Sequence, residues 1–290
     1  MIECSQARRD SIESRSGRPL ILDPRLVAII AVITTAAHSD GAITTISTVT
    51  VETVNFVSDA DSDLNVIPSN SVMSFIGSPD FTAAAYADGG GIVAVSLDAS
   101  AELELESIAS FSSHDLNATN SPATAELGFA INPGILRLTS ANSSLSYSIL
   151  VMAETSAGAL GTWESSGTLT ADANGEVTWT KSGVDLGTPA GGSVIPSGEV
   201  AIPAFIALWT PGVILGNDVL VIEYDMSLKL DAAGADYVEG ASANIADPFD
   251  VSGASPAITS VTFRPVPEPS GLVLLCVEAG TISRRRRRSA

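Results

Sequence analysis

The chain has 290 residues and a formal net charge of −19, and its cations gather at the two ends. Residues 40–266 keep four Lys or Arg against 27 Asp and Glu, which gives this segment a net charge of about −23. Such acidity argues against nucleic acid as a partner, because binding it requires Lys and Arg to neutralise phosphates. Both cysteines lie outside the segment, so no disulfide within it can stabilise the fold.

The first element is an apolar run at residues 26–37, with a basic segment before it and small residues after it. This order is typical of a secretory signal peptide. The run has about 12 residues, whereas spanning a bilayer takes roughly 20. We therefore expect a signal peptide over residues 1–39, with cleavage before Asp40; a buried core helix is the alternative.

The segment 40–264 is rich in Thr, Val and Ser, which favour strands over long helices. Within 101–111, Glu and Leu alternate, which predicts Glu102, Glu104 and Glu106 on one face of a strand and leucines on the other. Asn174-Gly175 predicts a type I′ hairpin turn, and a second turn is expected at 216–218. The expected strands are 43–57, 101–111, 145–152, 161–170, 176–181, 200–209, 219–230 and 258–264, with 231–255 as a loop or edge region.

Many short strands separated by turn residues predict an all-β fold for residues 40–264. We expect an antiparallel β-sandwich with a jelly-roll-like arrangement. The chain then divides into a signal peptide at 1–39, an extracellular sandwich domain at 40–264 and a C-terminal tail at 265–290.

An acidic stretch that follows the first strand is the candidate metal site. Asp59, Asp61 and Asp63 supply oxygen ligands at alternate positions, as at the start of an EF-hand loop. However, Leu64 stands where that loop needs glycine, and Asn70 stands where it needs a bidentate glutamate. We predict a generic loop calcium site at the three aspartates, with a solvated acidic turn as the alternative and no other cofactor.

The body shows no recognisable catalytic constellation, so we expect no enzyme activity. Its one histidine, His114, falls in a Ser/Asn-rich segment that reads as a solvated loop, and one His without Cys cannot build a zinc shell. Glu102, Glu104 and Glu106 would lie about 7 Å apart along a strand, a spacing that glycosidases use. A solvated sheet face is the expected explanation of these carboxylates, and a polysaccharide-acting hydrolase stays an alternative.

Three tryptophans bear on carbohydrate binding. Trp163 and Trp179 flank the expected hairpin, and Trp209 lies in a later strand. If exposed, they would form a platform on which sugar rings stack, as in a lectin-like sandwich. We expect them in the core instead, because the chain has few aromatic residues and a sandwich core needs them.

The C-terminus contains the triplet Pro267, Glu268 and Pro269, followed by an apolar stretch that Glu278 interrupts. The basic stop consists of Arg284, Arg285, Arg286, Arg287 and Arg288. Clustered arginine remains on the cytoplasmic side of a membrane. The stretch has about 13 residues, roughly 20 Å as a helix, and an ionisable residue within it disfavours stable spanning.

This order of triplet, apolar segment and arginine run resembles the PEP-CTERM sorting signal of biofilm-forming bacteria. The resemblance covers only the last 24 residues or so and is silent on activity. It implies a short C-terminal transmembrane helix, recognition by an exosortase, which is a membrane-embedded processing enzyme, and removal of the tail near Pro267-Glu268-Pro269. The glutamate in the apolar stretch favours a processing address over a permanent anchor.

Leader and tail together predict export to the cell surface or beyond, with transient membrane insertion through the tail. The leading hypothesis is a structural or adhesive protein of the surface or the extracellular matrix. Its expected partners are an exosortase-type enzyme and extracellular polysaccharide. A carbohydrate-binding, lectin-like sandwich and a polysaccharide-acting hydrolase are the two alternatives.

Overall fold

The computed structural model describes residues 43–52, 57–64, 71–100, 103–232, 240–246 and 248–266. These residues form seventeen β-strands, all paired antiparallel, and no helix. The prediction of an all-β antiparallel body is therefore confirmed. Both the signal peptide expected at 1–39 and the apolar tail helix lie outside the described residues. No helix in the described ranges is long and apolar enough to cross a bilayer.

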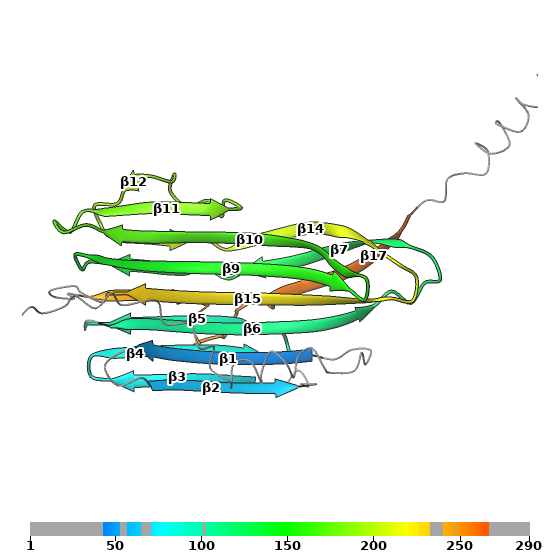
Figure 1. Ribbon diagram of the computed structural model, residues 1–290, viewed down its shortest axis with the longest axis horizontal. Helices are drawn as coiled ribbons and strands as arrows, with labels where there is room; N and C mark the ends of the chain where they lie inside the picture. Colours follow the sequence, from blue (N-terminus) through cyan, green and yellow to red (C-terminus); the bar gives the residue numbers. More distant parts are fainter. Residues whose placement is uncertain are drawn as a thin grey trace, which may run out of the picture. The chain divides into compact units, whose positions relative to one another are not determined.

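The first layer is an eight-stranded sheet with strand order β12-β11-β10-β9-β15-β6-β1-β2 (Figure 1). Its four central strands have 13 or 14 residues each, so they are long for strands of a globular protein. In sheet order, the strands are β12 (Ser193–Val194), β11 (Val177–Gly183), β10 (Gly158–Ala171), β9 (Ser143–Thr155), β15 (Val219–Asp231), β6 (Glu104–Leu116), β1 (Ile43–Glu52) and β2 (Val57–Leu64).

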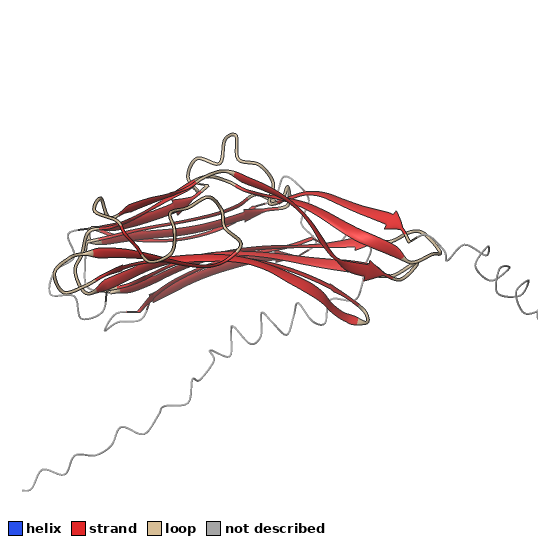
Figure 2. Cartoon of the chain, turned by 90° about the horizontal axis from the view of Figure 1, so that it is seen from above, coloured by secondary structure: helices blue, strands red, loops and turns tan. Residues whose placement is uncertain are grey.

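The second layer packs against the first and consists of two smaller sheets (Figure 2). The six-stranded sheet contains β13 (Glu199–Ile202), β8 (Gly134–Leu138), β16 (Ala241–Ile245), β5 (Val93–Ala99), β4 (Phe81–Asp88) and β3 (Ser71–Ser78), in that order. The three-stranded sheet contains β14 (Phe205–Ile214), β7 (Ala123–Ile131) and β17 (Ile258–Pro265).

The second layer is split into two sheets because the chain has a break at three places, each between a strand of one sheet and a strand of the other. β7 continues into β8 past Pro133, β13 continues into β14 past Pro203, and residues 246–257 separate β16 from β17. The order β13-β8-β16 in one sheet is repeated as β14-β7-β17 in the other. Proline has no N–H to donate to a ladder, so it ends pairing at these points. The three-stranded sheet is thereby separated from the six-stranded one.

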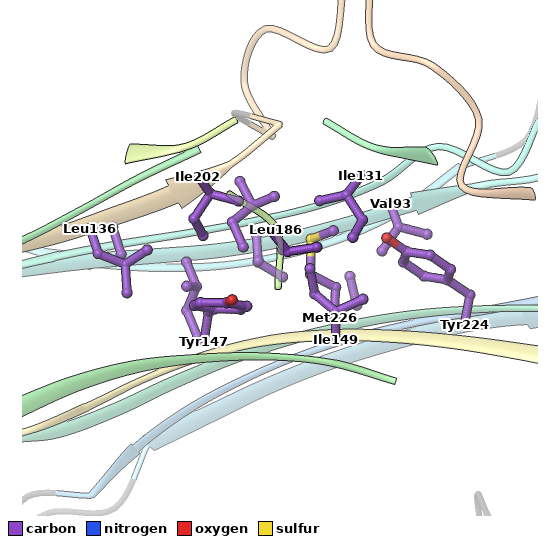
Figure 3. Close-up of a cluster of buried hydrophobic side chains, with 14 of the residues drawn as sticks. Val93, Ile131, Leu136, Tyr147, Ile149, Leu186, Ile202, Tyr224 and Met226 are labelled. Carbon is purple, nitrogen blue, oxygen red and sulfur yellow. The ribbon is translucent and has the colours of Figure 1, made fainter. Parts of the chain in front are cut away.

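The core lies between the two layers. In Figure 3, Val93, Ile131, Leu136 and Ile202 from the second layer face Tyr147, Ile149, Tyr224 and Met226 from the first. Two buried hydroxyls also join the layers: Ser107 donates to the carbonyl of Ala84, and Tyr224 donates to the carbonyl of Ala130 at 3.3 Å. Each hydroxyl thus satisfies its hydrogen-bonding capacity without water, as a buried polar group must.

The aromatic residues fill the core as expected. Trp179 is fully buried, and its ring stacks on Tyr147 with a centroid distance of 6.2 Å. Trp163 is also buried and meets Phe129 edge-on at 4.7 Å. Trp209 is partly buried against the same core. The prediction that the tryptophans belong to the core is therefore confirmed for Trp163 and Trp179, and Trp209 packs against the core only in part.

The hairpin at residues 172–175 exists, but its predicted turn type is wrong. Gly175 has a positive φ of 78°, whereas Asn174 does not, and a type I′ turn needs a positive φ at both central residues. The N–H of Gly175 donates to the carbonyl of Asp172 at 3.0 Å, and the N–H of Asp172 donates to the carbonyl of Glu176 at 3.1 Å. These bonds define a three-residue loop with glycine in the left-handed position.

Asp172 itself stabilises this loop. Its carboxylate accepts the N–H groups of Asn174 and Glu176, both at 2.8 Å. These backbone donors lower the pKa of Asp172, which is exposed. The second expected turn, at 216–218, is also present, with Asn217 at a φ of 58°. The segment 231–255, expected as a loop or edge region, contains the inner strand β16.

Candidate functional site

The candidate site is the outer face of the eight-stranded sheet, on which polar side chains recur in a regular pattern. Burial alternates along its strands, so every second residue points away from the core. In and just before β6, Leu103 and Leu105 are buried, whereas Glu104 and Glu106 are partly exposed. The predicted alternation of carboxylates and leucines is confirmed for these four residues; Glu102 lies outside the described residues.

Hydroxyl side chains dominate one half of this face, across β9, β10 and β11. The strand pairing places them opposite one another in three rows. Neighbours lie about 4.8 Å apart across strands and about 7 Å apart along them. The rows are Ser144, Thr170 and Thr178; Ser146, Thr168 and Thr180; and Ser148, Ser166 and Ser182. All nine are partly or fully exposed.

These hydroxyl rows form an uncharged lattice of donors and acceptors, since each Ser or Thr can do both. Such a lattice suits a neutral, hydroxyl-rich partner. In the sequence, the signal is only that Ser and Thr recur at alternate positions in each of the three expected strands. Only the pairing of the strands shows that the three sets lie side by side.

Partly buried carboxylates occupy the same face on β15. Burial raises the pKa of Glu223, and the negative charges of Asp225 and Glu154 raise it further. Burial also raises the pKa of Asp225, while a hydrogen bond from Ser110 opposes the shift. The pairing of β15 places Asp225 opposite Ser110 on β6. Ionising Glu223 or Asp225 in the folded protein is therefore less favourable than ionising the same group in water.

Glu223→Gln is expected to stabilise the fold at neutral pH. The folded-state pKa of Glu223 is raised, so the energetic cost of its charge is present at high pH and disappears as the pH falls and the group becomes protonated. The midpoint of thermal unfolding should rise at pH 7 by at most a few degrees, because solvent screens the charge of this partly exposed group.

Thermal unfolding of the two proteins from pH 7 to about pH 3.5, below the ordinary glutamate pKa, measures this. The difference should shrink at the acidic end. Glu164→Gln is the control, because it removes the same charge from an exposed position of the same face and should leave the midpoint nearly unchanged. An equal rise in the two variants would assign the effect to net charge alone.

His114 is not a loop residue, as the sequence suggested, but part of β6 opposite Val221. Its polar neighbours read as a loop because both faces carry polar residues at this end of the strand. Ser113 donates to the carboxylate of Asp115 at 3.1 Å. Burial raises the pKa of Asp115, and this hydrogen bond and the charge of His114 partly oppose that shift. Consecutive strand residues point to opposite faces, so these three residues do not form a catalytic triad.

The three aspartates of the calcium prediction lie in β2, a strand at the edge of the sheet, and not in a loop or turn. Asp59, Asp61 and Asp63 pair with Val49, Ser47 and Thr45 of β1. They occupy alternate positions, which an extended strand separates by about 7 Å. Among the side chains that the structure describes, which exclude those of β2, no group of three His, Cys, Asp or Glu is placed to hold a metal. The calcium site stays a prediction.

None of the tryptophans provides an exposed stacking platform, since two are buried and the third is partly buried. Trp163 and Trp179 point into the core from β10 and β11, the strands whose outer face carries the hydroxyl rows. The sugar contact expected from exposed aromatics is therefore absent at these three residues.

The sorting triplet and the arginine run, residues 267–269 and 284–288, lie outside the described residues. The described body ends immediately before the triplet. β17 ends at the exposed Pro265, and the N–H of Val266 donates to the carbonyl of Pro122 at 3.1 Å. The described residues therefore end at the end of the three-stranded sheet.

Comparisons with known proteins add no family. No family model matches the chain, and no curated protein matches it. Among solved structures, the chain is similar to a chain of the "Structure of infectious bursal disease virus Gx strain", with 11% sequence identity. The match covers 84% of this chain and 72% of that chain at a TM-score of 0.13. A likeness at this TM-score carries no argument about fold or function.

Proposed function

We propose that the protein is exported and delivered to the cell surface or extracellular matrix through its C-terminal tail. The supporting observation is the position of the tail. The last strand of the body ends at Pro265, so the triplet Pro267-Glu268-Pro269 begins two residues after the final ladder pair. A processing enzyme of the exosortase type can then reach the triplet without unfolding the sandwich.

The body serves a structural or adhesive role in this proposal. Long paired strands and a continuous core give a stiff module, and its acidity keeps it soluble outside the cell. We assign the sandwich to a jelly-roll-like arrangement as part of the same proposal. The calcium site at Asp59, Asp61 and Asp63 would add rigidity to the edge strand β2 if it forms.

Mass spectrometry of the mature protein from its host tests the sorting proposal. We expect the mature chain to begin near Asp40 and to end near the triplet, without the five arginines. Replacing Pro267, Glu268 and Pro269 together by alanine should leave the C-terminus intact and keep the protein in the membrane fraction. Pro265→Ala, at an exposed proline just outside the triplet, should be processed normally. A mature wild-type chain that retains all five arginines would refute the proposal.

Carbohydrate binding is a second candidate function, and the hydroxyl rows favour it. Nine exposed or half-exposed hydroxyls on β9, β10 and β11 match the chemistry of a neutral polysaccharide. The buried tryptophans disfavour ring stacking, so binding would depend on hydrogen bonds. A glycan array on the mature protein distinguishes an adhesive surface from a purely structural one.

A further inference from the structure

The edge strand β14 carries apolar side chains on both of its faces. Its inner face packs against the core, while three of its aliphatic side chains and one in the residue that follows the strand lie exposed: Ile206 by 77%, Leu208 by 73%, Val213 by 51% and, after the strand, Leu215 by 59%. In the ladder with β7, Ile206 lies opposite Ala130 and Leu208 opposite Gly128, both of them buried, whereas Val213 lies opposite the partly exposed Thr124. We call the four residues the β14 face. Exposed apolar rows on an edge strand mark an interaction surface or an aggregation site.

The rest of this sheet is free of net charge. Glu126 of β7 and Arg264 of β17 are its charged residues in the described strands, and they form an ion pair at 2.7 Å. Because residues 40–266 contain only four cations against 27 acids, a sheet on which every acid is neutralised differs from the remainder of the body. It can approach a neutral apolar partner without desolvating an unpaired charge.

The β14 face ends where the chain leaves the body. Ile214 at the end of β14 and Pro265 at the end of β17 both pair with Ala123 of β7. The next residues, Leu215 and Val266, therefore lie two strand spacings apart, about 10 Å. The apolar stretch of the tail begins at Gly271, five residues after Val266, and an extended chain of five residues spans at most about 18 Å.

We propose that the β14 face rests on the bilayer into which the tail inserts, and that it holds the sorting triplet at the membrane surface for processing. This inference depends on the proposed function of the tail. The ligand is a lipid surface with neutral headgroups. A second copy of the chain fits less well, because each body carries a charge of about −23 and two bodies repel each other, whereas the tail brings lipid to this end.

Site-specific labelling tests the inference, and the chain suits it because its two cysteines, Cys4 and Cys276, lie outside the body. In the full chain with both replaced by alanine, an environment-sensitive dye is attached at Ile206→Cys or at Ser148→Cys. Ser148 is exposed on the opposite layer. Each protein is mixed with phosphatidylcholine vesicles that contain a spin-labelled lipid as quencher, and flotation measures binding through the tail independently.

We expect both proteins to float with the vesicles, with blue-shifted, quenched emission at position 206 only. Adding Leu208→Ser and Leu215→Ser should leave flotation intact but reduce the docked population at least about tenfold, as the loss of two buried leucines implies. Flotation with equal emission at both positions overturns the inference and leaves the sorting proposal standing. Failure to float overturns the inference, because the face then has no bilayer to rest on, while the mass spectrometry of the mature chain tests the sorting proposal separately. A blue shift at 206 that grows with protein concentration without lipid assigns the face to self-association and also overturns the inference.

Discussion

Gly167→Val is expected to prevent the sandwich from reaching its native packing. Gly167 lies in β10, paired with Tyr147 and Lys181 on the neighbouring strands. A Cβ atom at this position would collide with the indole ring of Trp179 and with the ring of Tyr147. The two rings stack on each other. They occupy the space beside Gly167 because glycine has only a hydrogen atom in place of a side chain. Because this core is fully buried, neither ring has room to move away.

Alanine at position 167 should cost about 1–3 kcal/mol, as overpacking in a well-packed core does, and valine more. Urea unfolding followed by tryptophan fluorescence measures the change. Gly212→Ala is the matched control, because its Cβ would meet Leu160 at 3.5 Å, an ordinary contact, in a strand with no positive φ. Equal stabilities for the two alanine variants would show that the stacked pair does not need the glycine.

Trp163→Ala is expected to lower the free energy of unfolding by about 3–5 kcal/mol, the range for large aromatic side chains in a core. Trp163 projects from β10 to Phe129 of β7, and its ring also lies 6.2 Å from that of Phe205 on β14. Both partners belong to the three-stranded sheet. Prolines separate that sheet from the rest of the second layer, so this aromatic cluster is a main attachment of the sheet to the long strands.

The same unfolding experiment compares Trp163→Ala with Trp209→Ala. Trp209 is only partly buried, so its loss should cost less. Trp163→Phe should recover part of the stability, because it keeps an aromatic contact with Phe129. If Trp163→Ala cost no more than Trp209→Ala, the attachment of the three-stranded sheet would have to lie elsewhere.

Local pattern was sufficient to predict several elements from the sequence. The alternation of leucine with Glu104 and Glu106 identified a strand and its buried face, because side chains in strands alternate strictly. Gly175 marked a hairpin because glycine accepts a positive φ at little cost. The same reasoning failed at His114, since polar residues on both faces of a strand, here Ser113, His114 and Asp115, have the composition of a loop.

Pairing partners could not be predicted in the same way. β6 and β15 are neighbours that place Ser110 opposite Asp225, more than one hundred residues later. Backbone hydrogen bonds carry little sequence information, so the order of strands in a sheet depends on how whole faces pack. The hydroxyl rows of β9, β10 and β11 and the β14 face follow from that order, and neither could be identified from a single strand.

The sequence by itself determined the strand-forming body, its acidity, the absence of a bracing disulfide and the prediction of a sorting tail at the C-terminus. These properties depend on composition and on residues close together in the chain. The tertiary structure decided which strands pair, that the second layer splits into two sheets, and that the described residues end beside an apolar strand without charged side chains. Such features depend on contacts between distant segments, which only the folded chain brings together.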